Sequence, residues 1–356
     1  SAIFSIRYME HDTGLGAYYS ALVMMVAGMV GIAFAGDFFT LYIFWEIMSV
    51  ASYALVAFRK ERWEPVEAGF KYLIMSASGS ALMLLGMSFL YGMSGTLNFA
   101  ALSKAMGGVF LGYNPWPLLA LAFVVTGFGV KAAIAPFHTW LPDAHPAAPS
   151  PVSSMLSGVM IKTGIYGLIR VLILVFAPFQ AVWTISLMVL AVATMFVGNL
   201  MALVQTDLKR LLAFSSIAQI GYITFGLSIG TIYGLTGSIF HVMNHALMKG
   251  LLFMCAGAFL HAAGTRDLNE LTGIGRKMPV TGLIFAVGAM AIIGVPTLAG
   301  FVSELYIIMA GVGERAYLAT GLMLVNIAIS VAYYLRTMQI ILLRQPGEKL
   351  TGVKEA

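Results

Sequence analysis

The chain is dominated by long apolar runs that are separated by short polar connections. A transmembrane helix needs about 20 consecutive apolar residues, and ten stretches of this kind follow one another along the 356 residues. They cover residues 17–36, 38–58, 67–92, 116–135, 150–177, 180–204, 210–229, 233–262, 279–311 and 316–343. The longest connection, residues 93–115, contains one charged residue. The pattern predicts an all-α polytopic membrane protein with about ten transmembrane helices and no soluble domain.

Composition supports this class and excludes several others. Hydrophobic residues make up 60% of the chain and charged residues 10%, whereas soluble domains carry about 25% charged residues. The net charge of +5 is spread over short loops, so nucleic acid is not an expected partner. One cysteine, Cys255, excludes an intrachain disulfide and a cysteine-ligated cluster. Because no phosphate-binding or dinucleotide motif is visible, we expect no cofactor, no metal and no catalytic residue.

The basic residues predict an orientation. If the N-terminus lies on side A of the membrane, two basic residues, Lys104 and Arg315, fall on side B. Twelve fall on side A: Arg7, Arg59, Lys60, Arg62, Lys209, Arg210, Arg266, Arg276, Lys277, Arg344, Lys349 and Lys354. Such a bias marks the cytoplasmic side, so we expect a cytoplasmic N-terminus and an even number of helices. The first residues lack the basic and then apolar pattern of a signal peptide.

Two apolar segments contain breaks, the fourth at Pro136 and the ninth at Gly294-Val295-Pro296. The two prolines are 160 residues apart, and each broken segment is the fourth of five. Because five is odd, the second set of five starts on the opposite side, which predicts an inverted repeat with a transport site near the midplane. The predicted division is an N-terminal segment 1–16, units 17–177 and 178–343, and a tail 344–356. Two unrelated proline kinks are the alternative.

Two charges precede the first break. Lys131 lies five residues before Pro136, and Glu46 lies in the middle of the second apolar segment. A charge at the centre of a membrane helix costs roughly 2.5–3.5 kcal/mol on insertion scales, so pairing would lower the cost of both groups. Burial and a nearby carboxylate act in opposite directions on the proton affinity of a lysine. The two residues predict a proton carrier, although a static ion pair that locks two helices fits the same positions.

Further ionisable residues lie inside other segments. Lys162 is near the middle of the fifth segment, and His241, His245 and Lys249 are four residues apart in the eighth, on one helix face. Histidine titrates near neutrality, so this face is suited to carrying protons. The histidine pair could also bind a metal, but a third ligand is not evident and Lys249 would repel a cation.

Glu304 is the one acid inside the ninth segment, eight residues beyond Pro296. Together with the groups above it predicts a polar axis of acids and bases across the bundle. After the first break, His138, Asp143 and His145 are candidates for a water entrance, although the prolines and Trp140 could simply shape the turn. Asp37 and the Thr206-Asp207 pair are expected at helix starts, where their oxygens can cap backbone N–H groups.

The sequence around these residues resembles the antiporter-like membrane subunits of respiratory complex I, of multisubunit Na⁺/H⁺ antiporters and of membrane-bound hydrogenases. The resemblance covers residues 20–343 and lies in LYIFWEIMSVASYALVAF, KAAIAPFHTWLPDAHPAAPSPVSSMLSGVMIKTGIYGLIR, TDLKRLLAFSSIAQIGY, HVMNHALMKGLLFMCAGA and GVPTLAGFVSEL. It implies two inverted five-helix units with a broken fourth helix in each. It also implies that the protein lies in the cell membrane of a prokaryote. The implied partners are neighbouring membrane subunits and a peripheral redox module.

The resemblance also implies roles for the charged residues. Glu46 would pair with Lys131, the central proton carrier, and the relay would continue through Lys162, His241, His245 and Lys249 to Glu304 as the exit group. Some family members carry lysine at the last position. Members typically begin with three further helices and end with at least one more, so the chain resembles a short subunit or part of a longer one.

The sequence therefore predicts a proton-translocating subunit of a redox-driven complex, without an active site of its own. The first alternative is a subunit of a stand-alone Na⁺/H⁺ antiporter, which would use the same axis. A structural scaffold with inert salt bridges and a solute carrier are further alternatives, although no sign of a substrate pocket accompanies the line of ionisable groups.

Overall fold

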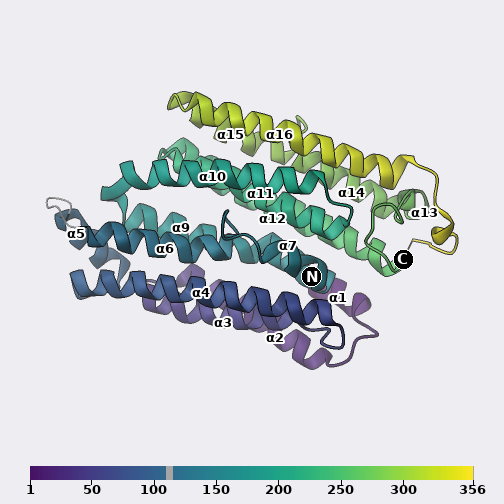
Figure 1. Cartoon of the computed structure of the whole chain (residues 1–356), viewed down its shortest axis with the longest axis horizontal. Coiled ribbons are helices and arrows are strands. Elements are labelled where there is room, and N and C mark those ends of the chain that lie inside the picture. The colour runs from purple at the N-terminus through teal and green to yellow at the C-terminus, as the bar shows by residue number, and fades with distance from the viewer. Residues whose placement is uncertain (110–114, 356) are drawn as a thin grey trace.

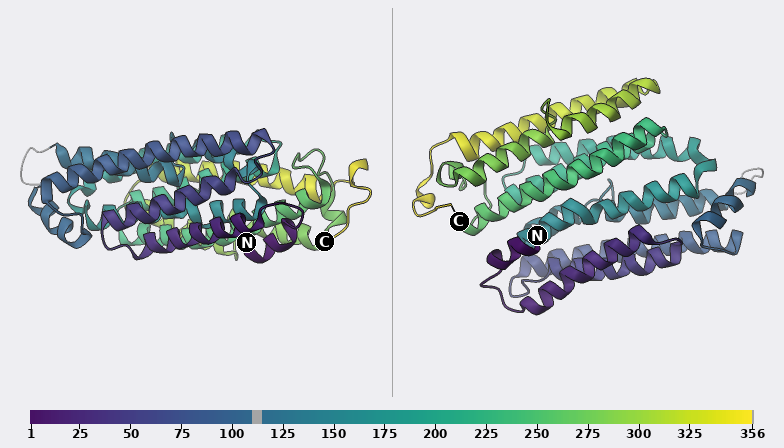
Figure 2. Two further views of the ribbon diagram at one scale, coloured as in Figure 1. Left: turned by 90° about the horizontal axis from the view of Figure 1, so that it is seen from below. Right: turned by 180° about the vertical axis from the view of Figure 1, so that it is seen from behind.

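The helices run side by side along the long axis of the molecule, and both chain ends lie at the same end of the bundle (Figure 1). The computed structural model describes residues 1–109 and 115–355. Helices α2, α3 and α4 gather on one side and α14, α15 and α16 on the other, with α10–α12 between them (Figure 2). Termini at one end agree with an even number of membrane crossings.

The elements follow each other in a simple order. The first half contains α1 (Ala2–Tyr8), α2 (Leu15–Phe34), α3 (Phe38–Val56), α4 (Trp63–Ser94), α5 (Phe99–Val109), α6 (Trp116–Ala132), α7 (Leu141–Ala147), α8 (Ser150–Met155), the π-helix η1 (Leu156–Met160) and α9 (Ile161–Leu174). The second half contains the 3₁₀-helix η2 (Ala177–Phe179), α10 (Gln180–Leu203), α11 (Leu208–Ser228), α12 (Ile232–Ala263), α13 (Ile274–Lys277), α14 (Pro279–Ile292), α15 (Ala299–Gly313), α16 (Tyr317–Met338), the π-helix η3 (Gln339–Leu343) and the 3₁₀-helix η4 (Glu348–Leu350).

The predicted membrane segments are confirmed. In the described part of the chain, eight helical segments are long and apolar enough to cross a membrane, and α6, α14 and α15 are shorter apolar helices. Helix α6 ends where the fourth segment breaks, and α14 and α15 are the two halves of the ninth. The division into units 17–177 and 178–343 stays a prediction.

Part of the long connection at residues 93–115 is helical, which the apolar pattern did not predict. Asn98 caps α5 by accepting hydrogen bonds from the N–H groups of Ala100 and Ala101, at 3.1 and 3.2 Å. Leu102 and Met106 of this helix are fully buried. A search for runs of about 20 apolar residues cannot detect a helix of 11 residues. Residues 110–114 of the connection lie outside the described residues.

Both expected acidic caps form. Asp37 accepts a hydrogen bond from the Thr40 N–H at the start of α3, at 2.8 Å, and Asp207 accepts one from the Arg210 N–H at the start of α11, at 2.9 Å. Each carboxylate satisfies a backbone donor that has no partner inside its helix. The caps place the beginnings of two helices that carry buried polar groups.

Helix α11 is the centre of the bundle. Every residue of this helix except Arg210 is buried. A Cβ on Gly198 of α10 would come within 2.8 Å of the Phe214 carbonyl oxygen, and a Cβ on Gly221 of α11 would come within 2.7 Å of the Met195 nitrogen. The two backbones therefore approach closely, as small residues permit in membrane bundles.

We predict that Gly198→Val destabilises the bundle by roughly 1–3 kcal/mol, because the new side chain must push two helix backbones apart. Thermal aggregation of the purified chain in detergent measures the loss. Gly321→Val in α16 is the control, since a Cβ there meets nothing within 4 Å. Equal melting temperatures for the two variants would contradict the close approach.

Candidate functional site

The first helix break provides its own hydrogen-bond partners. Helix α6 ends at Ala132, and Ala133 adopts a left-handed conformation with φ of 58°. The Trp140 indole donates to the Val130 carbonyl at 2.8 Å, and the Ala135 N–H donates to the Thr194 hydroxyl of α10 at 3.0 Å. Irregular backbone at membrane depth requires such partners because lipid supplies none. The break is therefore held from two sides.

Lys131 lies in the last turn of α6, where a cation is favoured by the helix dipole. Its side chain is 1% exposed. The amine donates hydrogen bonds to the Ser49 hydroxyl at 2.7 Å, the Ser76 hydroxyl at 2.8 Å and the Tyr72 hydroxyl at 3.2 Å. Trp140 stacks flat on Tyr72 with ring centroids 4.0 Å apart. Lys131 is thus held in a cage of neutral oxygens that the break itself helps to position.

Glu46 does not form the expected direct pair with Lys131. Among the described residues no ion pair joins the two side chains, and the Glu46 Oε1 atom is buried without a hydrogen-bond partner. Ser49, which binds Lys131, follows Glu46 by three residues on α3, so the two lie on neighbouring positions of one helix face. The carboxylate is therefore close to the cage but outside it.

Lys162 lies just after the π-helix η1, which widens the helix before α9 begins. Its amine donates to the Ser157 carbonyl oxygen inside the π-helix. The Ser157 hydroxyl is 2.7 Å from the Ser216 hydroxyl of α11. A π-helix leaves backbone carbonyls without their usual partner and often occurs at functional sites. The apolar pattern of the fifth segment did not predict this π-helix.

Lys249 is fully buried on α12. Its amine donates to the Leu212 carbonyl at 2.9 Å and to the Tyr334 hydroxyl at 3.1 Å. Tyr334 in turn is 2.8 Å from the Ser215 hydroxyl. The partners come from α11 and α16, and no feature of the sequence marked Tyr334 as one of them.

His241 and His245 lie on the same face of α12, as predicted, with parallel rings whose centroids are 6.1 Å apart. One nitrogen of His241 is 2.9 Å from the Ser303 hydroxyl, and the other is 2.6 Å from the Gln219 side-chain oxygen. Both ring nitrogens of His245 are buried, and no hydrogen-bond partner for them occurs in residues 1–109 and 115–355. His241 therefore connects α12 to α11 and α15.

Glu304 packs against the second break. Its side chain is 4% exposed, and its carboxyl lies so close to Gly294 that a Cβ there would collide with it. Gly294 has φ of 73° and Thr297 has φ of 80°, so both residues use the left-handed region that suits glycine. The Gln219 amide nitrogen is 3.5 Å from the Ile292 carbonyl oxygen, at the end of α14. The second break therefore positions Glu304, as the first positions Lys131.

The three entrance candidates are separated. Asp143 lies in a charged cleft of about 230 Å³ at the end of the bundle that carries the chain termini. It pairs with Lys71 at 3.0 Å and with Arg210 at 3.2 Å. His145 is fully buried, with its ring stacked on Phe253. His138 is half-buried beside the break, and its Nδ1 atom has no partner among the residues described.

Lys209, one of the basic residues assigned to side A, is buried rather than exposed at the end of the bundle. Its side chain is 1% exposed, and its amine donates to the Ala148 carbonyl at 2.6 Å. Arg266 donates to the neighbouring Pro146 carbonyl at 2.9 Å. The carbonyls freed between α7 and α8 thus bind a buried lysine just behind the charged cleft. Position near a loop in the sequence did not indicate this burial.

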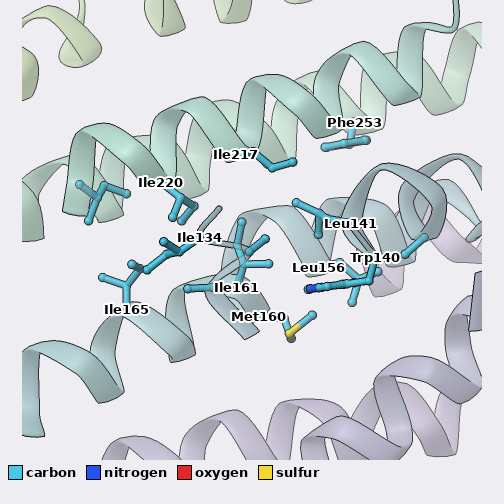
Figure 3. Packing of buried hydrophobic residues seen from close by; sticks show 14 of the residues in the cluster. Ile134, Trp140, Leu141, Leu156, Met160, Ile161, Ile165, Ile217, Ile220 and Phe253 are labelled. Atoms are coloured by element: carbon cyan, nitrogen blue, oxygen red, sulfur yellow. The ribbon is translucent and has the colours of Figure 1, made fainter. Parts of the chain in front are cut away.

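Apolar side chains lie between the first helix break and α11. Ile134 beside the first break belongs to the same layer as Ile217 and Ile220 of α11 (Figure 3). Trp140 and Met160 line the lower edge of this layer in the same view. Buried apolar side chains are therefore packed between the first break and α11.

Residues 35–330 match a family of membrane proteins described as "NADH:quinone oxidoreductase/Mrp antiporter, TM". The chain belongs to this family. It is 37% identical over 340 residues to NADH-quinone oxidoreductase subunit N of Desulforudis audaxviator, which covers 94% of this chain and 67% of that protein.

Two solved structures are similar to this chain. The first belongs to the Mrp complex from Dietzia sp., with a TM-score of 0.86, 30% identity and coverage of 92% of this chain and 61% of that chain. The second belongs to the membrane-bound sulfane sulfur reductase, an archaeal respiratory membrane complex, with a TM-score of 0.86, 33% identity and coverage of 94% and 68%. The chain thus spans about two thirds of the length of these relatives.

We predict that Thr194→Val loosens the first break, because the Ala135 N–H loses its partner at membrane depth. An unsatisfied buried donor costs about 1–3 kcal/mol. Amide hydrogen exchange over residues 133–140 should become faster. Thr126→Val is the matched control, because Thr126 bonds only to a carbonyl one turn earlier in its own helix, a bond that Thr194 also makes. Unchanged exchange in Thr194→Val would show that α10 does not hold the break.

Proposed function

We propose that this chain is a proton-translocating, antiporter-like subunit of a redox-driven membrane complex. Protons would pass along Glu46, Lys131, Lys162, His241, His245, Lys249 and Glu304. The observation that carries the proposal is that three buried lysines from three helical segments all donate to neutral oxygens. An ammonium without a fixed counter-charge is not locked by an ion pair, so its proton can be exchanged.

The position of Glu46 supports a switching role for Lys131. The amine is bound by three hydroxyls, while the carboxylate one turn away on α3 has a free oxygen. A lysine side chain is long and flexible enough to turn between two such sites. In the cage its contacts are neutral, and near Glu46 the charged form would be favoured. Movement between these positions would couple the proton on Lys131 to its surroundings.

The apolar layer beside the first break supports control of the relay. Ile134, Ile217 and Ile220 pack together beside the first break, in the buried apolar cluster that reaches α11. Protons need water or titratable groups in order to cross, and apolar constrictions can control passage by excluding water. We propose that proton transfer from the first half of the chain to the groups beside α11 requires water to enter this layer for a short time.

The charged cleft supports an entrance on side A. Asp143 lines it, and the buried groups Lys209 and His145 lie behind it. We place side A, with the N-terminus, in the cytoplasm of a prokaryote, because of the bias of basic residues towards this side. In this scheme units 17–177 and 178–343 each contribute one broken helix, and their relays meet at Ser157 and Ser216.

We predict that Lys131→Ala and Glu46→Gln each abolish proton translocation. The purified chain, with the subunits that accompany it, would be placed in vesicles loaded with a pH-sensitive dye. A potassium diffusion potential would then drive proton entry. Losing a titratable group from a relay removes a step that neighbouring groups cannot supply, so the flux should fall to that of empty vesicles.

Two surface variants control for expression and charge. Lys104→Ala removes a lysine from an exposed position on α5, and Glu61→Gln removes an acid from an exposed loop. Both should retain the flux of the unaltered chain. If Lys131→Ala pumps normally while it assembles in equal amount, the proposed relay is wrong and the buried charges are structural.

A subunit of a stand-alone Na⁺/H⁺ antiporter is the second candidate, favoured by the likeness to the Mrp complex. The same vesicles distinguish the two. Under the second candidate an inward sodium gradient alone should drive proton exit, and radioactive sodium should accumulate inside. Under the first, sodium has no effect, and a redox module should be found among the subunits that purify with the chain.

A further inference from the structure

A polar pocket at the second helix break surrounds His241 and is built from three helices. Its members are all buried: His241 and Asn244 of α12, Gln219 of α11 and Ser303 of α15. The Gln219 amide reaches the end of α14, and the Asn244 amide reaches the start of α15. The relay proposed above includes His241 and gives no role to the other three residues.

The orientation of the Gln219 amide is fixed by a backbone carbonyl. Its nitrogen lies 3.5 Å from the Ile292 carbonyl oxygen, and a carbonyl oxygen only accepts hydrogen bonds. The amide oxygen is therefore the atom that faces His241, at 2.6 Å from the Nε2 nitrogen. Because an amide oxygen also only accepts, His241 Nε2 carries a hydrogen and donates it to Gln219.

This hydrogen bond selects one form of the neutral His241 imidazole. A neutral histidine has one ring nitrogen with a hydrogen and one without. Since Nε2 keeps its hydrogen in both charge states, Nδ1 is the nitrogen that binds and releases the exchangeable proton. Nδ1 lies 2.9 Å from the Ser303 hydroxyl oxygen. Proton exchange at His241 is thus directed towards α15 and the second break, and away from α11.

Ser303 can bond to His241 in both charge states. When His241 is neutral, the Ser303 hydroxyl donates to Nδ1. When His241 is charged, Nδ1 donates to the serine oxygen, and the hydroxyl hydrogen turns to the Gly300 carbonyl, at 3.0 Å. The Asn244 amide nitrogen donates to Ser303 at 3.0 Å and is fixed in this orientation by the Ala299 carbonyl, at 2.8 Å.

We propose that Gln219 is a positioning residue that fixes the tautomer of His241, and that Ser303 carries protons between Nδ1 and the second break. In the neutral state the Ser303 oxygen uses one lone pair for Asn244 and leaves the other free. A proton that arrives there lets Ser303 pass its own hydrogen to Nδ1, so the serine ends neutral and His241 ends charged. The inference rests on the proposed proton relay and names the face through which one station is loaded.

The neighbouring rings make this face decisive. Tyr222 and His245 lie beside His241, with ring centroids 6.3 and 6.1 Å away. Both nitrogens of His241 are already bonded, one to Gln219 and the other to Ser303. A proton that comes from His245 therefore has to enter His241 from the side of Ser303.

Nitrogen NMR tests the tautomer directly, because a ring nitrogen with a hydrogen and one without give well-separated signals. The chain would carry isotope-labelled histidine and be measured in lipid vesicles with the subunits that accompany it. The measurement is made at about pH 8, above the ordinary pKa of histidine, and subtracting the spectrum of His241→Asn isolates the His241 signals. In the unaltered chain Nε2 should carry the hydrogen. Gln219→Met keeps the side-chain length and removes the acceptor, so the hydrogen should move to Nδ1, where Ser303 can accept it.

Ser303→Ala tests the second part of the proposal. The Nδ1 signal should move, since a bare nitrogen changes its signal when it loses a hydrogen bond, while Nε2 keeps its hydrogen. Proton flux in the dye-loaded vesicles described above should fall about tenfold, as expected for the loss of one hydrogen bond of ordinary strength.

Ser228→Ala is the matched control for Ser303→Ala. Ser228 is equally buried, and its hydroxyl donates to the carbonyl of Phe225, three residues earlier, at 2.7 Å. Ser303 makes the same kind of bond to Gly300. Ser228→Ala should therefore keep both the flux and the His241 signals of the unaltered chain.

Two results would overturn the inference for Gln219: a hydrogen on Nδ1 in the unaltered chain, or a hydrogen that stays on Nε2 in Gln219→Met. The first measurement needs no variant, so it decides the matter even if Gln219→Met does not fold. Equal flux in Ser303→Ala and Ser228→Ala overturns the role of Ser303. The tautomer is read without any flux, so full flux in Lys131→Ala would contradict the relay separately.

Discussion

A charge inside a membrane must have polar partners, and this constraint determines the arrangement of the whole bundle. An isolated ion in hydrocarbon is costly, and lipid offers no hydrogen bonds. Lys131, Lys162 and Lys249 meet the constraint with hydroxyl and carbonyl oxygens. A regular helix uses its backbone carbonyl oxygens in its own hydrogen bonds. Some of the carbonyl oxygens that bind lysine are therefore available only where a helix is interrupted or packs tightly against a neighbour.

The interruptions therefore have a chemical purpose as well as a geometric one. The first break brings Trp140 onto Tyr72, which binds Lys131. The π-helix frees the Ser157 carbonyl for Lys162, and the second break provides a glycine that lets Glu304 approach the backbone. In each case an irregular backbone and an ionisable side chain occur together.

Much of this arrangement could be predicted from the sequence, because a charge in an apolar run is a rare and readable signal. Glu46, Lys131, Lys249 and Glu304 were found in this way, and Asp37 and Asp207 by their capping chemistry. The hydroxyl partners could not be found, since serine and tyrosine are common in membrane helices and their meaning depends on which helices meet. The burial of Lys209 was missed for the same reason: its carbonyl partners are about 60 residues away in the chain.

Helix α10 shows how the two halves of the molecule can influence each other. Its Thr194 hydroxyl binds the backbone of the first break, and its Asn199 amide binds Tyr222 of α11 and Tyr333 of α16. Five residues separate these two contacts on one rigid helix. A small movement of the break that shifts α10 would therefore also shift the hydrogen bonds of Tyr222 and Tyr333. The apolar layer between the halves can exclude water and still transmit such a movement, because packed side chains are nearly incompressible.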